Sequence, residues 1–322
     1  HECGQNRVGA IGEVEEAADM IDAYTAQMEE HDGFVTELGS LDPGERNRSV
    51  LRPFGVWAVL APFNFPFALS LGMSSGALLA GNTVVYKPAS ATPISGFELQ
   101  RIWAEAGVPA GAFNYVTGSG EEVGETLALH PGVDGVIFTG SKEVGFDLYK
   151  RIPTSWPKPV ITELGGKNPT IVTARADLSM AVEGVARSAF GVSGQKCSAC
   201  SRGYVEPPGY ATRWLVHDSI YDEFVERLTA RAGELSVGDP TDKDSFLGPV
   251  INDRAAERYR EAIDIARRDG GTVRAGGETL SGDRYDKGNF VAPTVIDGLP
   301  IKHELFKREL FLQVVVVAPV DD

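Results

Sequence analysis

Between residues 56 and 162, short apolar segments alternate with longer segments of helical character, and no other feature constrains the fold as strongly. The apolar segments have the length of strands and end at turn residues; they are Val56 to Leu60, Thr83 to Tyr86, Phe113 to Val116, Gly135 to Thr139 and Val160 to Thr162. The helical segments between them are Phe67 to Leu79, Pro93 to Ala106, Glu121 to Ala128 and Glu143 to Ile152. Strands that alternate with helices form parallel sheets with helices on both faces. We therefore predict an α/β fold with a doubly wound, Rossmann-like parallel sheet that binds ligands at the carboxyl ends of its strands.

A second α/β unit is predicted after Glu163. Its expected strands are Thr170 to Val172, Thr272 to Arg274, Phe290 to Val295 and Leu312 to Val317, and its expected helices are Leu178 to Phe190, Ile220 to Leu235 with Ser219 as a cap, and Asp253 to Arg268. Near the start of the chain, an amphipathic helix from Val8 to about Met28 is predicted. Its apolar residues at helical spacing are Val8, Ile11, Ala18, Ile21, Tyr24 and Met28. Residues 34–54 read as short β-like pieces around an Asp42-Pro43-Gly44 turn.

The composition bounds the class of protein. The chain has 322 residues, 43% of them apolar, which is enough for two domains with a core each. Its formal net charge of −15, from 45 acidic against 30 basic residues, argues against nucleic acid and anionic membranes as partners. Only ten of the basic residues are Lys, and an acidic, Lys-poor surface suits a salt-rich cytoplasm that screens self-repulsion. That hypothesis fails if the protein folds equally well in dilute buffer and in concentrated KCl.

The cysteines and the chain ends suggest a compartment. Cys3, Cys197 and Cys200 are too few for a disulfide framework and favour a reducing cytosol. No apolar stretch reaches the roughly 20 residues that a membrane span requires, and no charged-then-apolar signal segment follows His1. We expect a cytoplasmic protein. Because the chain opens on His1 and stops at Asp322 directly after an apolar run, we also expect a fragment of a longer protein.

The strongest functional signal is Cys197, which lies in the small, polar, glycine-containing segment 190–202 (FGVSGQKCSACSR). A single cysteine is more often an inert core residue than a nucleophile. Three other elements precede this one, however: PFNFP at 62–66, FTGSKEVG at 138–145 and ELGGKN at 163–168. Four such elements in this order resemble the NAD(P)-dependent aldehyde dehydrogenase superfamily, and the resemblance covers most of the chain.

The resemblance implies an enzyme that oxidises an aldehyde to a carboxylic acid through a thiohemiacetal and a thioester. The Cys197 thiolate would supply the tetrahedral adduct whose carbon expels hydride. The side-chain amide of Asn64 and the backbone N–H of Cys197 would form the oxyanion hole. Glu163 would activate the water that hydrolyses the thioester. Taken alone, Asn64 reads as a turn former and Glu163 as a solvated strand end.

Most of the cofactor-binding residues are expected after two strand ends. The usual GxGxxG fingerprint is absent, and the chain instead offers Gly140, Ser141 and Gly145 at a strand-to-helix turn, where a helix N-terminus can face the pyrophosphate. Lys87 resembles the family's lysine that bonds the adenosine ribose. Ser90 stands where many relatives carry Glu, which removes a repulsion against a 2′-phosphate. We expect NAD as the cofactor, and NADP stays open.

Two further cofactor contacts are implied near the end of the chain. Glu309 and Phe311 resemble the residues that bond the nicotinamide ribose and pack beside the nicotinamide ring. The sequence departs from the family here, because it continues Leu312-Gln313-Val314 instead of Gly-Pro-Val. A surface helix end is the alternative interpretation of Glu309.

The run GQKCSACSR (194–202) looks most like the branch of the family that acts on L-glutamate γ-semialdehyde, the open form of 1-pyrroline-5-carboxylate in proline breakdown. In that branch the residue matching Ser198 contacts the substrate, and Lys196 beside it suits an amino-acid carboxylate. Three alternatives stay open. They are another aldehyde dehydrogenase, such as one for succinate semialdehyde; a CoA-acylating dehydrogenase, which is expected to lack the hydrolytic Glu; and a non-catalytic structural or binding relative.

The resemblance also implies the domain plan. Residues 1–163 would form the cofactor-binding domain, with 34–54 joining the subunits of a homo-oligomer, and 164–322 a catalytic domain that is incomplete at its C-terminus. Residues 206–215 (EPPGYATRWL) depart from the family's pattern and read as an extra exposed loop. Cys197 and Cys200 also form a CxxC pair, but no second ligand pair accompanies it, so no metal site is expected.

Overall fold

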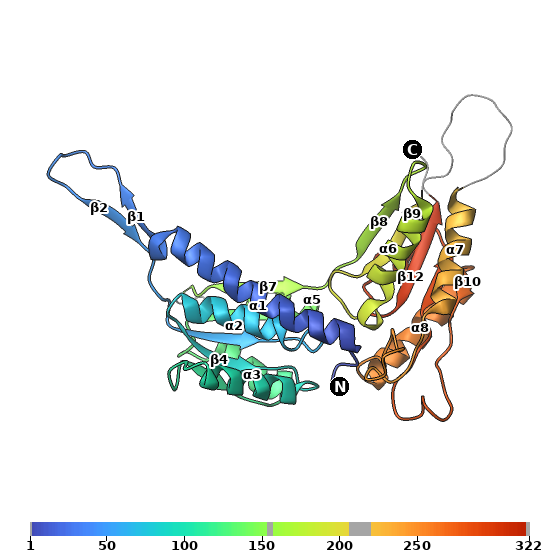
Figure 1. The fold of residues 1–322 in the computed structure, drawn as a ribbon, viewed down its shortest axis with the longest axis horizontal. Helices are drawn as coiled ribbons and strands as arrows, with labels where there is room; N and C mark the ends of the chain where they lie inside the picture. The colour runs from blue at the N-terminus through green and yellow to red at the C-terminus, as the bar shows by residue number, and fades with distance from the viewer. Residues whose placement is uncertain (1, 153–156, 206–219, 320–322) are drawn as a thin grey trace. The chain divides into compact units, whose positions relative to one another are not determined.

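In the computed structural model, residues 2–152, 157–205 and 220–319 are described (Figure 1). The chain divides into two compact units. The N-terminal unit comprises Glu2 and Ala10–Leu164, and the C-terminal unit comprises Cys3–Gly9 and Gly165–Asp322. Each unit has its own five-stranded sheet.

The sheet of the N-terminal unit has the strand order β5-β4-β3-β6-β7, and every neighbouring pair is parallel. Its strands are β3 (Val56–Leu60), β4 (Thr83–Lys87), β5 (Phe113–Tyr115), β6 (Gly135–Gly140) and β7 (Val160–Leu164). The chain order reverses between β3 and β6, which is the topological switch point where such sheets bind ligands. The predicted doubly wound sheet is confirmed.

Helices cover both faces of this sheet. They are α1 (Arg7–Glu30), α2 (Ala68–Leu79), α3 (Pro93–Glu105), α4 (Glu125–Leu129), which follows the π-helical turn η2 (Gly120–Gly124), and α5 (Lys142–Arg151). Alternate residues of β3 point to opposite faces. Trp57 and Val59 share a core cluster with residues of α1, α2 and α3, whereas Ala58 and Leu60 share one with residues of α4 and α5.

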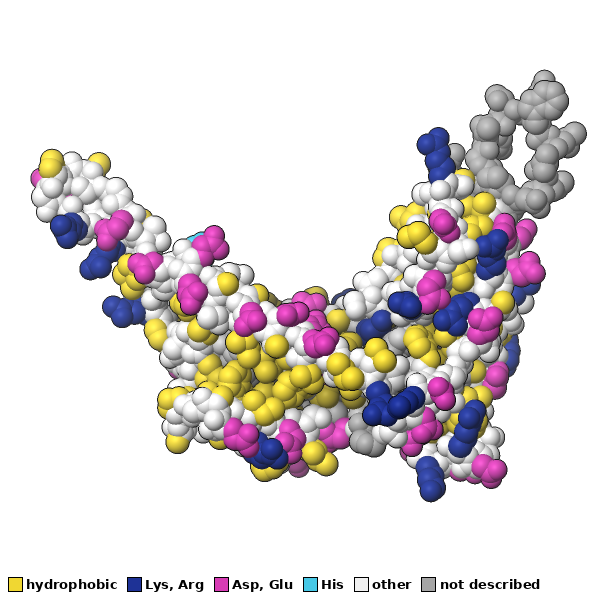
Figure 2. Space-filling view, viewed as in Figure 1, with side chains coloured by type: hydrophobic (Ala, Val, Ile, Leu, Met, Phe, Trp, Pro, Cys, Tyr) yellow, Lys and Arg dark blue, Asp and Glu magenta, His cyan; other side chains and the backbone are white. Residues whose placement is uncertain are grey.

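The first helix is confirmed, but only part of its apolar stripe faces the core: Ile21, Tyr24 and Met28 are half-buried, and Ile21 packs against the core of the unit. Val8 and Ile11 are 80% and 62% exposed, and Ala18 is exposed as well. The buried residues are Glu13 and Ala17, four residues apart. The Glu13 carboxylate faces the start of α2. Acidic side chains follow the exposed side of α1 (Figure 2).

The polar segment after α1 forms an antiparallel hairpin. A 3₁₀ turn, η1 (Asp32–Phe34), leads into β1 (Val35–Leu38), which pairs with β2 (Asn47–Val50). In the predicted turn, the Asp42 carboxylate accepts a hydrogen bond from Gly44 N at 2.9 Å. An aspartate that bonds backbone two residues on stabilises such a turn locally.

The sheet of the C-terminal unit has the order β10-β11-β12-β9-β8. Its strands are β8 (Asn168–Val172), β9 (Cys200–Val205), β10 (Thr272–Ala275), β11 (Thr294–Asp297) and β12 (Val314–Pro319). All neighbours are parallel except β10 and β11. The helices are α6 (Leu178–Phe190), continued by the 3₁₀ turn η3 (Gly191–Gly194), then α7 (Ile220–Glu234), α8 (Asp253–Arg268) and the 3₁₀ turn η4 (Glu304–Phe306). Val315 and Val317 of β12 pack with α6 and α7, while Val314 and Val316 pack with α8, so this sheet is also covered on both faces.

Two strands of this unit begin later than predicted. The strand expected from Phe290 begins at Thr294, because Pro293 lacks the N–H that a sheet ladder needs. The strand expected from Leu312 begins at Val314, because Phe311 adopts a left-handed conformation with φ 58°. The predicted cap Ser219 and the extra loop at 206–215 lie outside the described residues.

No helix within residues 2–152, 157–205 and 220–319 is both long enough and apolar enough to cross a membrane.

Candidate active site

The predicted residues of the N-terminal unit lie at the carboxyl ends of its strands. Lys87 ends β4 and is level with Leu60, the last residue of β3. Asn64 follows β3 and is buried, with 3% exposure. Ser141 follows β6, and Glu163 is the exposed next-to-last residue of β7. The sheet therefore brings Lys87, Asn64, Ser141 and Glu163 to one edge, as the fold class predicts.

Lys87 is a buried cation at this edge. Its side chain is 6% exposed, its Nζ donates a hydrogen bond to the Pro88 carbonyl at 2.9 Å, and burial lowers its pKa. Ser90, three residues on, is exposed and donates from its hydroxyl to the Gly118 carbonyl at 3.0 Å. A lysine held in this way can offer its remaining N–H groups to an outside acceptor.

The N-terminus of α5 is the second polar feature of the edge. The Ser141 hydroxyl accepts a hydrogen bond from Val144 N at 3.4 Å and so caps the helix. Helix N-termini carry partial positive charge and favour anions. Gly145 lets this helix lie close to the sheet, because a Cβ there would overlap the Leu164 side chain of β7. Gly140, the last residue of β6, immediately precedes the cap.

The turn that carries Asn64 is fixed by a residue that the sequence did not identify. The Glu13 carboxylate of α1 accepts hydrogen bonds from Phe67 N at 2.7 Å and Ala68 N at 3.0 Å. These are the first amide groups of α2, whose cap residue Phe67 has no side-chain oxygen. The chain's own carboxylate therefore occupies the helix N-terminus that follows β3. The signal that identifies Glu13 is its helical spacing from the buried Ala17.

A second pair of contacts ties the same turn to the sheet. The Ser70 hydroxyl donates to the Pro66 carbonyl at 2.6 Å, and the Tyr86 hydroxyl of β4 donates to Ser70 at 2.7 Å. Burial raises the pKa of Tyr86, so the phenol stays a donor. The segment from Asn64 to Pro66 is thus held from both α1 and β4.

In the C-terminal unit the candidate residues lie at the opposite end of the strands. Residues 165–167, 195–199 and 309–313 directly precede β8, β9 and β12, which are parallel neighbours. The amino edge of this sheet therefore brings together Cys197, Ser198, Glu309 and Phe311. Cys197 is half-buried and Ser198 is exposed, whereas Cys200 is 3% exposed.

Glycines allow the loops at this end of the sheet to approach one another closely. The Glu309 carboxylate accepts a hydrogen bond from Gly166 N at 2.9 Å, and a Cβ on Gly165 would overlap that carboxylate. A Cβ on Gly166 would lie 2.9 Å from the Cys197 carbonyl oxygen. The glycine pair after Glu163 is therefore required by the approach of Glu309 and of the Cys197 loop.

The titratable groups around Cys197 have different environments. Burial, helped by neighbouring Arg202 and opposed by Cys200 and Glu309, lowers the pKa of Lys167 to about 8. Burial also lowers the pKa of Lys196, which the Cys197 thiol counteracts. Burial raises the pKa of the Cys200 thiol, to which the Thr170 hydroxyl donates at 3.0 Å. Cys200 is thus a core residue, while its neighbour Cys197 is accessible.

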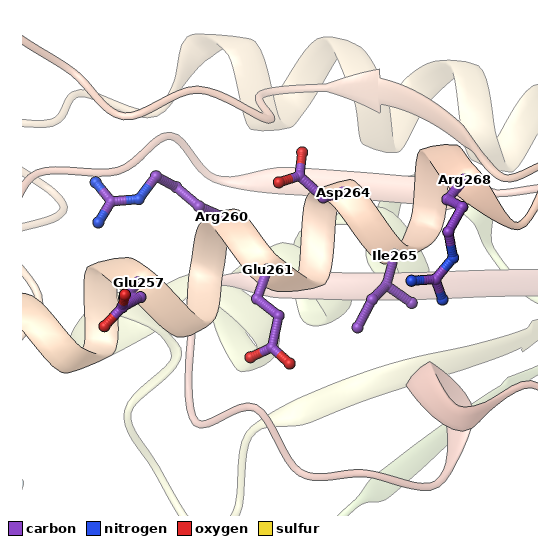
Figure 3. Close-up of a pocket in the computed structure, with 6 residues that line it drawn as sticks. All are labelled: Glu257, Arg260, Glu261, Asp264, Ile265 and Arg268. Atoms are coloured by element: carbon purple, nitrogen blue, oxygen red, sulfur yellow. The ribbon is translucent and has the colours of Figure 1, made fainter.

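A surface groove on α8 contains none of the predicted residues (Figure 3). Its lining comes from successive turns of this one helix: Glu257, Arg260, Glu261, Asp264, Ile265 and Arg268. The lining mixes acidic and basic side chains, and Arg308 pairs with Glu261 at 3.3 Å. Mixed charges on one helix surface are typical of a solvated face.

Comparison with known proteins places these residues in context. The model of the Aldehyde dehydrogenase family matches residues 1–322. The chain is 39% identical over 327 residues to a 1-pyrroline-5-carboxylate dehydrogenase of Geobacillus sp. (strain WCH70), covering 100% of this chain and 60% of the relative. A 1-pyrroline-5-carboxylate dehydrogenase 1 of Halalkalibacterium halodurans is similar to the same extent. The chain thus spans about 60% of the length of the curated relatives that it matches.

Solved structures show the same similarity. A 1-pyrroline-5-carboxylate dehydrogenase from Thermus with bound NAD is 37% identical with a TM-score of 0.90, covering 100% of this chain and 60% of that one. An E. coli NADP dependent enzyme is 34% identical with a TM-score of 0.90, covering 100% and 63%.

Proposed function

This chain belongs to the aldehyde dehydrogenase family, and we propose that it oxidises L-glutamate γ-semialdehyde to L-glutamate with NAD(P)⁺. The observation that carries the proposal is the placement of Cys197. It is half-buried in a turn at the amino edge of its sheet, with the Glu309 and Ser198 segments at the same edge, while Cys200 is sealed in the core. The similarity to 1-pyrroline-5-carboxylate dehydrogenases at 39% identity supports the substrate.

Cys197 acts as the nucleophile in this proposal. Its thiolate attacks the aldehyde carbon, forming a C–S bond and an oxyanion. The Asn64 side-chain amide and the Cys197 backbone N–H donate hydrogen bonds to that oxyanion. When the oxyanion collapses, the carbon expels hydride and a thioester on Cys197 remains.

Glu163 acts in the second half of the reaction. Its carboxylate takes a proton from water, and the resulting hydroxide adds to the thioester. Collapse of this adduct breaks the C–S bond, which releases the carboxylic acid and returns the Cys197 thiolate. The exposure of Glu163 next to the end of β7 supports this role, because water can reach it.

The proposal assigns residues of each unit to a nicotinamide dinucleotide. Lys87 and the capped N-terminus of α5, with Gly140, Ser141 and Gly145, offer donors for the ribose and the pyrophosphate. Glu309 and Phe311 would hold the nicotinamide riboside. The bound cofactor supplies the hydride acceptor. We favour NAD, and the uncharged Ser90 leaves NADP open; the compared structures include one with bound NAD and one described as NADP dependent.

Two basic or polar residues beside Cys197 support an amino-acid substrate. Ser198 is exposed and offers a hydroxyl donor, and the half-buried Lys196 offers an ammonium group. Burial strengthens the attraction of such a cation for a carboxylate. We assign Ser198 to substrate binding on this basis.

The proposal extends to the assembly and the compartment. The hairpin β1–β2 carries exposed Leu38 and Leu41, and Leu51 follows it, so it offers apolar area to a second subunit of a homo-oligomer. The cofactor would bind mainly to the N-terminal unit, and the nucleophile belongs to the C-terminal unit. The small number of cysteines supports a cytoplasmic location.

The test is NADH formation by the purified protein with pyrroline-5-carboxylate and a panel of other aldehydes, including succinate semialdehyde, with and without CoA. We expect the highest kcat/KM for pyrroline-5-carboxylate, no requirement for CoA, and no turnover by Cys197→Ala. A higher kcat/KM for another aldehyde would reassign the substrate, and full activity of Cys197→Ala would remove the mechanism.

A further inference from the structure

The loop that carries Cys197 consists of two consecutive tight turns. Gln195 N donates to the Val192 carbonyl at 3.0 Å, and Ala199 N donates to the Lys196 carbonyl at 3.1 Å. Cys197 is the second residue of the second turn. The loop 192–199, called here the nucleophile loop, has no regular secondary structure beyond the end of η3 to hold it.

The first turn of the nucleophile loop is strained. Val192, Ser193 and Gly194 have φ angles of 55°, 53° and 66°. The left-handed region is unfavourable for a β-branched residue such as Val192. A conformation of this kind persists only where surrounding contacts fix it.

Buried contacts fix the first turn from one side. The Ser193 hydroxyl donates to the Gly248 carbonyl at 2.9 Å, and the Gln195 side chain accepts from Ile251 N at 3.0 Å. Ser193 and Gln195 are each 1% exposed. The first turn is therefore anchored without any help from β8.

The second turn, which contains Cys197, is fixed by Asn168 at the start of β8. The Asn168 Nδ2 donates to the Cys197 carbonyl at 2.6 Å and to the Ala199 carbonyl at 3.1 Å. Both N–H groups of the amide are thus used on the backbone of this turn. On the other side of the turn, Cys200 N donates to the Ser188 hydroxyl at 3.0 Å.

These contacts have two separate structural roles. Ser193 and Gln195 hold the strained first turn, whereas Asn168 sets the peptide plane that follows the Cys197 Cα and the one that follows Ala199. Loss of the Asn168 amide would leave the anchors of the first turn intact. It would, however, free rotation at the residue that bears the sulfur.

We infer that Asn168 is a positioning residue that holds the Cys197 thiol in its reactive orientation through the Cys197 and Ala199 carbonyls. This inference rests on the proposed role of Cys197 as nucleophile. Asn168 itself touches neither substrate nor cofactor in this assignment. A displacement of about 1 Å at a reacting atom is enough to cost about 100-fold in rate.

The test compares Asn168→Ala with Asn114→Ala. Asn114 is a matched control in the N-terminal unit, because its Nδ2 also donates to two backbone carbonyls, of Val84 at 3.2 Å and of Gly111 at 2.7 Å. Two quantities are measured in the purified proteins. The first is kcat and KM for NAD with pyrroline-5-carboxylate, and the second is the alkylation rate of each cysteine by iodoacetamide, followed by peptide mass spectrometry.

For Asn168→Ala we expect kcat to fall about 10-fold to 100-fold while KM for NAD stays within about two-fold of the parent value. We also expect alkylation of Cys197 to speed up at least about three-fold, because the turn that half-buries it is released, while the buried Cys200 stays protected. Asn114→Ala should change neither quantity. Slower turnover combined with faster alkylation of one thiol is the signature of lost orientation.

Two results would overturn the inference. One is an Asn168→Ala protein with the parent kcat and the parent Cys197 alkylation rate. The other is parallel acceleration at Cys197 and Cys200, which indicates general loosening. If Asn168→Ala does not fold, Asn168→Ser, which keeps one donor, takes its place with the same signature expected at smaller size and the same two results overturning it. Turnover by Cys197→Ala would instead contradict the proposed function, so the two failures are distinguishable.

Discussion

The two sheets present their candidate residues at opposite ends. In the N-terminal unit Lys87, Asn64 and Ser141 lie at or just beyond the carboxyl ends of strands, next to helix N-termini. In the C-terminal unit Cys197 and Glu309 lie before the amino ends of strands, in loops that contact one another. The first arrangement offers amide groups and a positive helix end to an anion that binds reversibly. The second fixes Cys197, the proposed nucleophile of the chain.

The difference extends to how each edge is packed. The carboxyl end of the N-terminal sheet, where the cofactor is proposed to bind, is called here the cofactor edge. A Cβ on Gly145 at this edge would meet the end of the Leu164 side chain, which can move. The amino end of the C-terminal sheet, which carries Cys197, is called here the nucleophile edge. A Cβ on Gly194 at this edge would overlap the backbone of Leu312 and Gln313, which cannot move without shifting β12. The end of the sheet that is proposed to bind the cofactor can therefore adjust locally, whereas the end that holds the proposed nucleophile is built from backbone contacts.

Glu163 gives the strongest test of this division of roles between the two sheets. It lies on the cofactor edge but is proposed to act in the chemistry. Glu163→Ala should lower steady-state turnover about 10²-fold to 10⁴-fold, since the general base is lost. It should still give one burst of NADH per site, followed by slow thioester release. Rapid-mixing kinetics measure this, with the exposed Glu105→Ala on α3 as the control. Steady cycling at the parent rate would remove Glu163 from the role of base.

Substitutions of Gly194 and Gly145 test the difference in packing between the two edges. Gly194→Ala should lower the free energy of unfolding of the C-terminal unit by about 2–4 kcal/mol, because a left-handed residue gains a Cβ that meets backbone. Gly145→Ala should cost the N-terminal unit only about 1 kcal/mol, because Leu164 can adopt another rotamer. Urea denaturation followed by fluorescence measures both. Equal losses would mean that the two edges are equally adaptable.

Lys167 is expected to make the free energy of unfolding depend on pH. Its pKa is about 8 in the folded chain against an ordinary value of 10.5. Between these values the unfolded chain binds more protons, so the contribution of Lys167 to stability grows as pH rises through this window and is lost as pH falls through about 8. The gain is at most about 1.4 kcal/mol per pH unit.

Lys167→Met lacks this titration. The free energy of unfolding of the parent, measured relative to that of Lys167→Met, should therefore increase between pH 8.5 and pH 9.5. Urea denaturation at the two pH values measures the difference. A constant difference would show that the Lys167 ammonium titrates outside this window.

Glu13 is expected to have a small effect on stability. Glu13→Ala should cost about 1 kcal/mol through the loss of a cap on α2 and should also lower kcat, because the turn that carries Asn64 loosens. Glu2 is its matched control, since its carboxylate caps α3 by accepting from Ile94 N at 2.8 Å and Ser95 N at 2.7 Å. Glu2→Ala should lose similar stability with unchanged kcat. Thermal unfolding and steady-state kinetics of both variants test this, and an equal fall in kcat would contradict a special role of Glu13.

The sequence alone determined the fold class and most of the elements, although it did not predict β9. The alternation of strands and helices after Val56 gave the doubly wound sheet, because strand and helix periodicities reflect steric preferences that act within a few residues. It also predicted that the cofactor binds at the ends of β3, β4, β6 and β7, since parallel strands end at a common edge. Cys197 stood out by its polar, glycine-containing surroundings.

Only the tertiary structure decided which groups meet. Glu13 bonds the start of α2 at a separation of 54 residues, Asn168 bonds Cys197 across 29 residues, and Gly166 bonds Glu309 across 143 residues. The burial of Glu13 and Ala17 in α1 and the late start of β12 also escaped the sequence patterns. A periodic pattern records which residues avoid water, but the choice of partner for a buried carboxylate or amide depends on how distant elements pack, because each such group must find a hydrogen bond where the fold places it.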